Sequence, residues 1–114
     1  LMDDLADRGL LQDTLIVTLS EFGRTPGINP SLGRDHFASA WSSALIGAGV
    51  QGGAVWGKSD ENGQTVAEGE VKAGDLFATI YEAVGIDHTK EFHVGSRPIP
   101  ITDFGCGPIQ SLLA

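Results

Sequence analysis

The segment Leu15–Leu19 (LIVTL) constrains the fold more than any other part of this sequence. It is a short, uninterrupted run that is rich in β-branched residues, and turn-prone residues flank it, so it predicts a β-strand. Because the run is compact, with Thr18 as its one polar residue and no regular alternation of polar and apolar side chains, we expect this strand to be buried on both faces. Strands of that kind belong to parallel or mixed sheets that helices cover.

Apolar residues at helical spacing predict two helices. Leu1–Leu10 has apolar positions on one face and acidic residues outside it, and Asp75–Val84 has a broad apolar side that ends at Gly85. Asp87–Gly107 shows little periodicity. Shorter elements are predicted as strands at Ser42–Ile46 and Ala54–Gly57 and as a closing helix at Pro108–Leu113. The alternation of helices and strands indicates an α/β fold.

The charge balance limits the partners of this chain. It has 15 acidic and 7 basic residues, for a net charge of −8, which argues against nucleic acid because phosphate binding needs a basic face. The acidic excess could help to hold a divalent cation, or it could only keep the surface soluble. No apolar run approaches the ~18 residues needed for a membrane span. Cys106 is the single cysteine, so no internal disulfide can form.

Two candidate site residues follow the predicted strand directly. In an open α/β sheet, ligands bind beyond the carboxyl ends of the strands, which is where Glu21 lies. Its carboxylate suits a metal ligand or a general base, although it could equally cap nearby amides or face water. Arg24 offers a planar fork of donors that suits a tetrahedral oxyanion such as phosphate or sulfate. The alternative is that Arg24 pairs with a neighbouring carboxylate.

A second candidate cluster is the Asp35–His36 pair. Together these side chains supply the oxygen and nitrogen ligands that hold Zn²⁺ or Mn²⁺. Asp35 could instead orient the imidazole of His36, and His36 could act as a general acid or base. The ordinary alternative is a loop histidine that is hydrogen-bonded to backbone. His88 and His93 flank Glu91, but no other feature of that segment supports a site.

Several segments together resemble one known family. They are RGLLQDTLIVTLSEFGRTP (8–26), GRDHF (33–37), GAGVQGGAVWGKSD (47–60), DLFATIYEAVGID (75–87) and RPIPI (97–101). In this order they are similar to the bacterial, sulfatase-like domain-of-unknown-function 1501 family of the alkaline phosphatase superfamily. The combination of EFGRTP with a later GRDH is the most specific part of the resemblance.

The resemblance implies a three-layer α/β sandwich with helices on both faces of a central sheet, of which residues 1–114 would be the C-terminal portion. Glu21-Phe22-Gly23 stands where superfamily enzymes have an Asp-His-Gly metal motif, and Phe22 cannot bind metal. His36 lies where these enzymes often place a later histidine ligand. The resemblance therefore implies a divalent metal ion (Zn, Mn, Mg or Ca) with Glu21, Asp35 and His36 as ligands.

The same resemblance implies hydrolysis of a small phosphate or sulfate ester, with Arg24 and His36 in catalytic roles and export of the parent protein. No residue here matches the nucleophile, so we expect it upstream, in the remainder of the parent domain, and we expect the fragment alone to be inactive. Two alternatives remain. The chain could bind an anion, a metal or a polysaccharide without catalysis, or it could serve only as a packing half of the parent domain.

Overall fold

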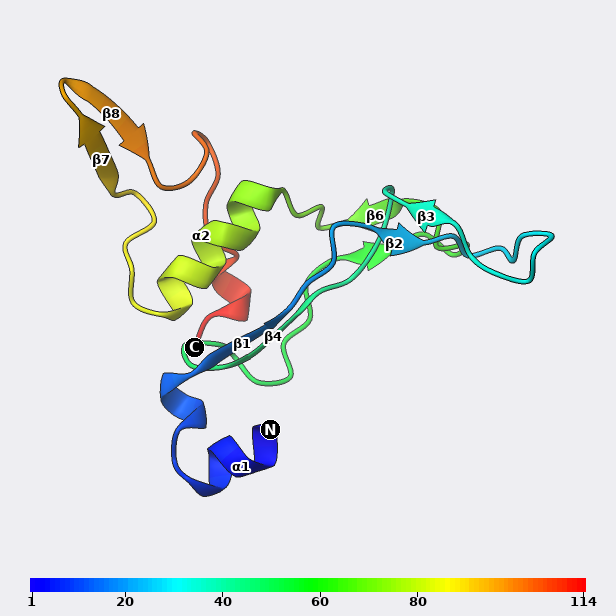
Figure 1. The fold of residues 1–114 in the computed structure, drawn as a ribbon, viewed down its shortest axis with the longest axis horizontal. Helices are drawn as coiled ribbons and strands as arrows, with labels where there is room; N and C mark the ends of the chain where they lie inside the picture. Colours follow the sequence, from blue (N-terminus) through cyan, green and yellow to red (C-terminus); the bar gives the residue numbers. More distant parts are fainter. The chain divides into compact units, whose positions relative to one another are not determined.

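The computed structural model describes residues 1–114, drawn as a ribbon in Figure 1. These residues form two compact units. Unit 1 comprises Leu1–Ile16, Ile46–Val55 and Val71–Ala114, and unit 2 comprises Val17–Leu45 and Trp56–Glu70. None of the helices has the length and apolar character that crossing a membrane requires. Each unit is described by itself below.

The chain mixes short helices with short strands. In chain order they are α1 (Met2–Asp7), the 3₁₀ helix η1 (Leu11–Asp13), β1 (Leu15–Thr18), β2 (Gly23–Arg24), β3 (His36–Phe37), β4 (Ala44–Gly47), β5 (Lys58–Ser59), β6 (Val66–Glu68), α2 (Ala73–Ala83), β7 (Glu91–Val94), β8 (Arg97–Pro100) and the 3₁₀ helix η2 (Gln110–Leu112). The strands pair two by two, as β1–β4, β2–β3, β5–β6 and β7–β8, and the last three pairs are antiparallel.

The strand predicted from LIVTL is present as β1, but its burial differs from the expectation. Leu15 and Ile16 are half-buried, whereas Val17 and Thr18 are exposed. The only strand paired with β1 is β4, so no strand of this chain covers its second edge. A larger covered sheet, and with it the three-layer sandwich, stays a prediction.

The short strand predicted at Ala54–Gly57 is wrong. Ala54–Gly57 has no regular secondary structure, and the ladder of β5 starts only at Lys58. Gly57 has φ +77°, which is a left-handed conformation that a strand does not contain. A Cβ atom on Gly57 would also lie 2.8 Å from the carbonyl oxygen of Gly69, so this position serves a close backbone approach.

Helix α2 carries the buried part of unit 1. All four buried residues of the chain lie on it, at Gly74, Ala78, Thr79 and Ala83. Small residues predominate because neighbouring chain comes close, as at Gly74, where an added Cβ would lie 2.5 Å from the Sγ atom of Cys106. Burial raises the pKa of the Cys106 thiol, and the charge of Asp75 raises it further. Cys106 is therefore a packing residue.

Hydrogen bonds anchor α2 to the C-terminal segment. The hydroxyl of Thr79 donates to the carbonyl oxygen of Asp75 (2.7 Å) and accepts from the N–H of Ile109 (2.9 Å). One carboxylate oxygen of Asp75 accepts from the N–H of Gly107 (3.0 Å), and the other accepts from the N–H of Lys72 (3.2 Å). The pKa of Asp75 is lowered, chiefly by the Gly107 hydrogen bond. The start of the helix thus fixes the chain that precedes η2.

The segment Asp87–Gly107, which shows little periodicity, contains the β7–β8 hairpin. Its two-residue turn consists of Gly95, with φ +62°, and Ser96, which is the type II′ arrangement that suits the twist of paired strands. The signal is weak in sequence because prolines stand at two of the four positions of β8, and proline within a run argues against a strand.

A pair of glycine substitutions tests the close packing against α2. Gly49 and Gly85 both have left-handed backbones, with φ +68° and +77°. A Cβ on Gly49 would lie 1.9 Å from the carbonyl oxygen of Ala83, whereas a Cβ on Gly85 would meet nothing within 4 Å. We expect Gly85→Ala to cost about 1–2 kcal/mol for the backbone conformation alone. Gly49→Ala should cost more, because α2 must shift, and urea unfolding of both variants measures the difference. Equal costs would contradict the close approach.

Candidate functional site

The predicted site residues lie in unit 2, around the β2–β3 hairpin. The register of this hairpin places Arg24 directly opposite His36 and Gly23 opposite Phe37. Directly opposed residues of antiparallel strands project from the same face, so Arg24 and His36 share a face. Gly23 is required by crowding, since an added Cβ would lie 2.6 Å from the carbonyl oxygen of Ala40.

Phe22 joins these two residues. Its ring stacks on the imidazole of His36 with 3.9 Å between centroids and 23° between planes. The Cζ atom of Arg24 lies 5.5 Å from the centroid of the same ring, within the range of a cation–π interaction. Phe22 therefore acts as an aromatic support for a guanidinium and an imidazole. Arg24 and His36 are both exposed to solvent.

The loop between β2 and β3 is closed by polar contacts that hold this face. The N–H of Asp35 donates to the hydroxyl of Thr25 (3.1 Å), and the N–H of Thr25 donates to the carbonyl oxygen of Asp35 (3.1 Å). A carboxylate oxygen of Asp35 accepts from the side-chain amide of Asn29 (2.9 Å). Arg34 donates to the carbonyl oxygens of Thr25 and Pro26. Asp35 and Arg34 thus shape the loop that presents His36.

The three predicted metal ligands are not gathered in this arrangement. Glu21 is exposed and makes no side-chain hydrogen bond, the carboxylate of Asp35 holds Asn29, and the ring of His36 lies against Phe22. Their ligand atoms do not form a group within 4.8 Å of one another. As arranged here, these residues do not fit a metal centre, and no metal geometry can be derived from them.

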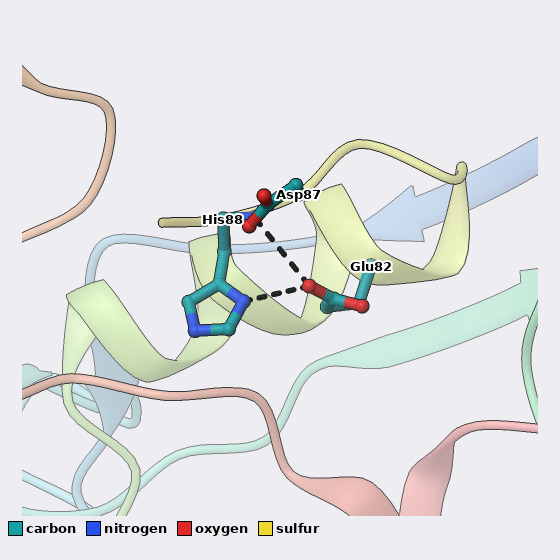
Figure 2. Close-up of side chains that lie close together, drawn as sticks. All are labelled: Glu82, Asp87 and His88. Carbon is teal, nitrogen blue, oxygen red and sulfur yellow. Dashed lines mark hydrogen bonds and ion pairs between the residues drawn. The ribbon is translucent and has the colours of Figure 1, made fainter. Parts of the chain in front are cut away.

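A different group does bring its ligand atoms within 4.8 Å of one another. It consists of Glu82, Asp87 and His88 at the end of α2 in unit 1 (Figure 2). The Nδ1 atom of His88 lies 2.7 Å from a carboxylate oxygen of Glu82, and the N–H of His88 donates to the same oxygen over 3.4 Å. The pKa of Glu82 is lowered, mainly by the hydrogen bond from the His88 side chain.

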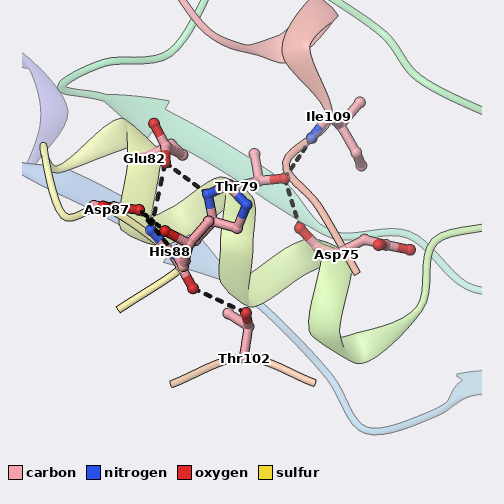
Figure 3. A network of polar contacts seen from close by, with 8 residues as sticks. Asp75, Thr79, Glu82, Asp87, His88, Thr102 and Ile109 are labelled. Atoms are coloured by element: carbon pink, nitrogen blue, oxygen red, sulfur yellow. Dashed lines mark hydrogen bonds and ion pairs between the residues drawn. The ribbon is translucent and has the colours of Figure 1, made fainter. Parts of the chain in front are cut away.

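Hydrogen bonds account for the closeness of this group. Asp87 accepts from both the N–H (2.9 Å) and the hydroxyl (2.6 Å) of Thr89, and the Thr89 hydroxyl is the main cause of its lowered pKa. Thr102 donates to the carbonyl oxygen of His88 (3.0 Å) and so continues the network beyond β8 (Figure 3). The donor types would suit zinc or manganese. Their contacts, however, are hydrogen bonds that tie the end of α2 to the segments around the β7–β8 hairpin. The group of Glu82, Asp87 and His88 is called the clasp below.

The sequence draws attention to His88 but not to its neighbours Glu82 and Asp87. Glu82 is six residues earlier and on the other side of a helix end, a spacing that belongs to no ligand motif. Only the turn at Gly85, where the N–H donates to the carbonyl oxygen of Glu82, brings the two side chains together. A glycine directly after a helix that carries Glu, followed by Asp-His, is the one local signal that could have suggested the contact.

Residues 1–113 match the family model described as Protein of unknown function (DUF1501). The chain belongs to this family. No curated protein and no solved structure matches the chain. The match covers nearly the whole DUF1501 chain and includes both units, so the β2–β3 hairpin and the Glu82–His88 clasp are both parts of the family domain.

The lowered pKa of Glu82 predicts a pH dependence for the clasp in the DUF1501 chain. Because the folded-state pKa lies below the ordinary value of 4.5, ionised Glu82 contributes stability above about pH 4.5. That contribution is lost as the pH falls through the folded-state pKa. We expect Glu82→Gln to lower the urea midpoint at pH 6, and the difference from wild type to shrink by about pH 3.

Glu70→Gln, at an exposed glutamate without a polar partner, is the matched control for that measurement. It should leave the urea midpoint unchanged at both pH values. A Glu82→Gln defect of equal size at both pH values would show that the carboxylate charge is not what holds the clasp.

Proposed function

We propose that the protein is a metal-dependent hydrolase of phosphate or sulfate esters, sulfatase-like and of the alkaline phosphatase superfamily. This chain would be the C-terminal part of its α/β sandwich and would supply an oxyanion-binding edge. One observation carries the proposal: the β2–β3 register sets the guanidinium of Arg24 opposite the imidazole of His36 on one face. Phe22 supports both groups.

The contacts of Arg24 leave it available for an anion. Although the chain has a net charge of −8, Arg24 forms no ion pair with a carboxylate. Its one hydrogen bond within the chain runs from Nη1 to the carbonyl oxygen of Arg34 (3.2 Å). The remaining N–H groups of its planar fork match the oxygens of a tetrahedral phosphate or sulfate.

His36 suits proton transfer beside such an anion. Its imidazole has nitrogen atoms that can carry or accept a proton, and it lies directly across the ladder from the proposed anion-binding group. In this proposal the imidazole donates a proton to the leaving oxygen of the ester as the bond to phosphorus or sulfur breaks. Stacking on Phe22 fixes the plane of the ring and so directs its N–H groups.

The divalent metal ion in this proposal is inferred from the family resemblance and not from the geometry of the site. A divalent ion would polarise the ester oxygen and activate the nucleophile. The proposal assigns Glu21, Asp35 and His36 as its ligands from this chain, and for His36 this role is an alternative to donating a proton, because a protonated imidazole does not coordinate a metal. Because these side chains are not gathered here, no step of the reaction is derived through the ion. The nucleophile and further ligands would come from outside the 114 residues.

The second candidate function is anion binding without catalysis. It is favoured by Phe22, which occupies the position of a metal-binding histidine in the superfamily motif and stacks on the histidine that would have to replace it. The same face would then hold a phosphate, a sulfate or an anionic polysaccharide without cleaving it.

Substitution of Arg24 tests the oxyanion role in the natural-length protein. We expect Arg24→Ala to lower kcat/KM on aryl phosphate or aryl sulfate esters by about 10²–10³, the loss seen when one donor to a developing oxyanion is removed. Arg8→Ala, at an exposed arginine that pairs with Asp4 over 2.9 Å, is the control and should keep full activity. Wild type that binds inorganic phosphate or sulfate through Arg24 but hydrolyses neither ester would favour the second candidate.

Elemental analysis of the natural-length protein tests the metal. We expect about one or two equivalents of a divalent ion in wild type, and a loss of metal in the Glu21→Ala/His36→Ala double variant. Glu82→Gln/His88→Gln is the matched control, because it removes the carboxylate–imidazole contact that the structure shows in unit 1. Loss of metal only in this control would show that Glu82 and His88 hold the metal. Absence of metal from wild type after incubation with Zn²⁺, Mn²⁺, Mg²⁺ and Ca²⁺ would exclude a metallohydrolase.

A further inference from the structure

The outer edge of β7 carries unpaired backbone groups. The N–H of Ile101 donates to the carbonyl oxygen of Lys90 (3.1 Å), so these two residues form a hydrogen-bonded pair at the base of the hairpin. Such pairs alternate with non-hydrogen-bonded pairs along an antiparallel ladder. The pairs at Glu91 and His93 are therefore the non-hydrogen-bonded ones, and the N–H and C=O groups of Glu91 and His93 point away from β8.

The two edges of the hairpin differ in what they can pair with. Pro100 lies opposite Glu91 and Pro98 lies opposite His93, so both prolines occupy outward-facing backbone positions of β8. Proline has no N–H, and a strand edge with prolines at these positions cannot form a regular ladder. The edge of β7 keeps all of its donors and acceptors. An additional strand can therefore join this hairpin only at β7.

The side chains of the hairpin are also distributed unequally. Phe92, Val94 and Ile99 share one face, and their exposed fractions are 68%, 67% and 41%. Glu91 and His93 project from the other face and are exposed as well. A strand that fits this edge should place an apolar residue opposite Phe92, a basic group opposite Glu91 and an acidic group opposite His93.

We propose that β7 pairs with β7 of a second copy of the protein, antiparallel and about a twofold axis at Phe92. In this register Phe92 faces Phe92 of the second copy, and Glu91 faces His93 of the second copy twice. The two Glu91–His93 pairs use the outward-pointing backbone groups and are hydrogen-bonded, while the Phe92 pair is of the non-hydrogen-bonded type, in which side chains lie closest. The result is a continuous four-stranded sheet, β8–β7–β7–β8.

Charge selects this register among the symmetric ones. Moving the twofold axis by one residue in either direction keeps the backbone pattern, but it places Glu91 opposite Glu91 or His93 opposite His93. Like charges directly opposite are destabilising, whereas carboxylate and imidazole side chains can form an ion pair or a hydrogen bond. A twofold contact is isologous, so each substitution on it acts twice.

Charge reversal tests the proposal in the natural-length protein. We expect wild type to dimerise and Glu91→Lys to raise the dimer dissociation constant by at least about tenfold in sedimentation equilibrium, because two attractive pairs become unfavourable. The double variant Glu91→Lys/His93→Glu exchanges the charges and should restore dimerisation. The exchange is clean within one copy, since Glu91 and His93 face only Pro100 and Pro98 there. Glu70→Lys, the same change at an exposed position outside the hairpin, should leave the constant unchanged.

Cross-linking tests the register independently. In a Cys106→Ser background, we expect Phe92→Cys to form a covalent dimer with oxidised glutathione, since its Cβ atoms would meet at the axis. Val94→Cys, whose counterpart would be Lys90 of the second copy, should remain uncross-linked. A monomeric wild type would overturn the proposal and indicate that another strand of the same polypeptide covers β7. A dimer that tolerates Glu91→Lys, or that the double variant fails to restore, would overturn it as well.

Discussion

The hydroxyl of Thr79 is the interaction on which the order of unit 1 depends. It is the buried polar group of α2, and it is satisfied on both sides, as a donor to the preceding turn and as an acceptor from Ile109. Because an unpaired buried hydroxyl or N–H costs about 1–3 kcal/mol, this arrangement admits only one placement of the C-terminal segment. One turn earlier, the carboxylate of Asp75 also accepts a hydrogen bond from the C-terminal segment, from the N–H of Gly107. The start of the helix therefore holds the C-terminal segment through two independent contacts.

Hydrogen bonds also hold the C-terminal end of α2, and here the acceptor is the carboxylate of Glu82. The carboxylate of Glu82 forms hydrogen bonds with the ring Nδ1 atom and the backbone N–H of His88. The hydroxyl of Thr102 donates to the carbonyl oxygen of His88. The β7–β8 hairpin lies between these two bonds in the chain, so its two ends are held although all of its strand residues except Pro100 are exposed. A hairpin that is fixed at its base and exposed along its strands presents a preformed edge, and little ordering entropy opposes strand addition there.

The sequence could predict the elements that rest on local pattern but not those that rest on contacts. The Leu15–Leu19 strand and the α2 helix with its stop at Gly85 follow from apolar spacing and glycine chemistry, and both are present within a few residues. The strand prediction at Ala54–Gly57 was wrong because Gly57 has a left-handed backbone, which the fold requires and the apolar sequence does not reveal. The candidate site divides in the same manner. The closeness of Arg24 and His36 arises from an eleven-residue loop closed by Thr25 and Asp35, and the stacking of Phe22 on His36 arises from the pairing of the two strands, so neither can be read from the residue types alone. The Glu82–His88 contact arises from a turn.

Burial decides what these residues can do chemically. Arg24 and His36 are exposed, and in water an arginine–oxyanion interaction is weakened by the high dielectric constant and by salt. An ester hydrolase needs the same groups in a site from which water is excluded, where fixed donors stabilise the developing charge far more strongly. Val17 in β1 and Leu19 directly after it are 37% and 51% exposed, and further polypeptide could cover this apolar surface. Under the proposed hydrolase function, covering β1 would lower the dielectric constant beside the residues that follow it in sequence and would strengthen the contact of Arg24 with an anion. The face by itself would then bind anions weakly and leave esters intact.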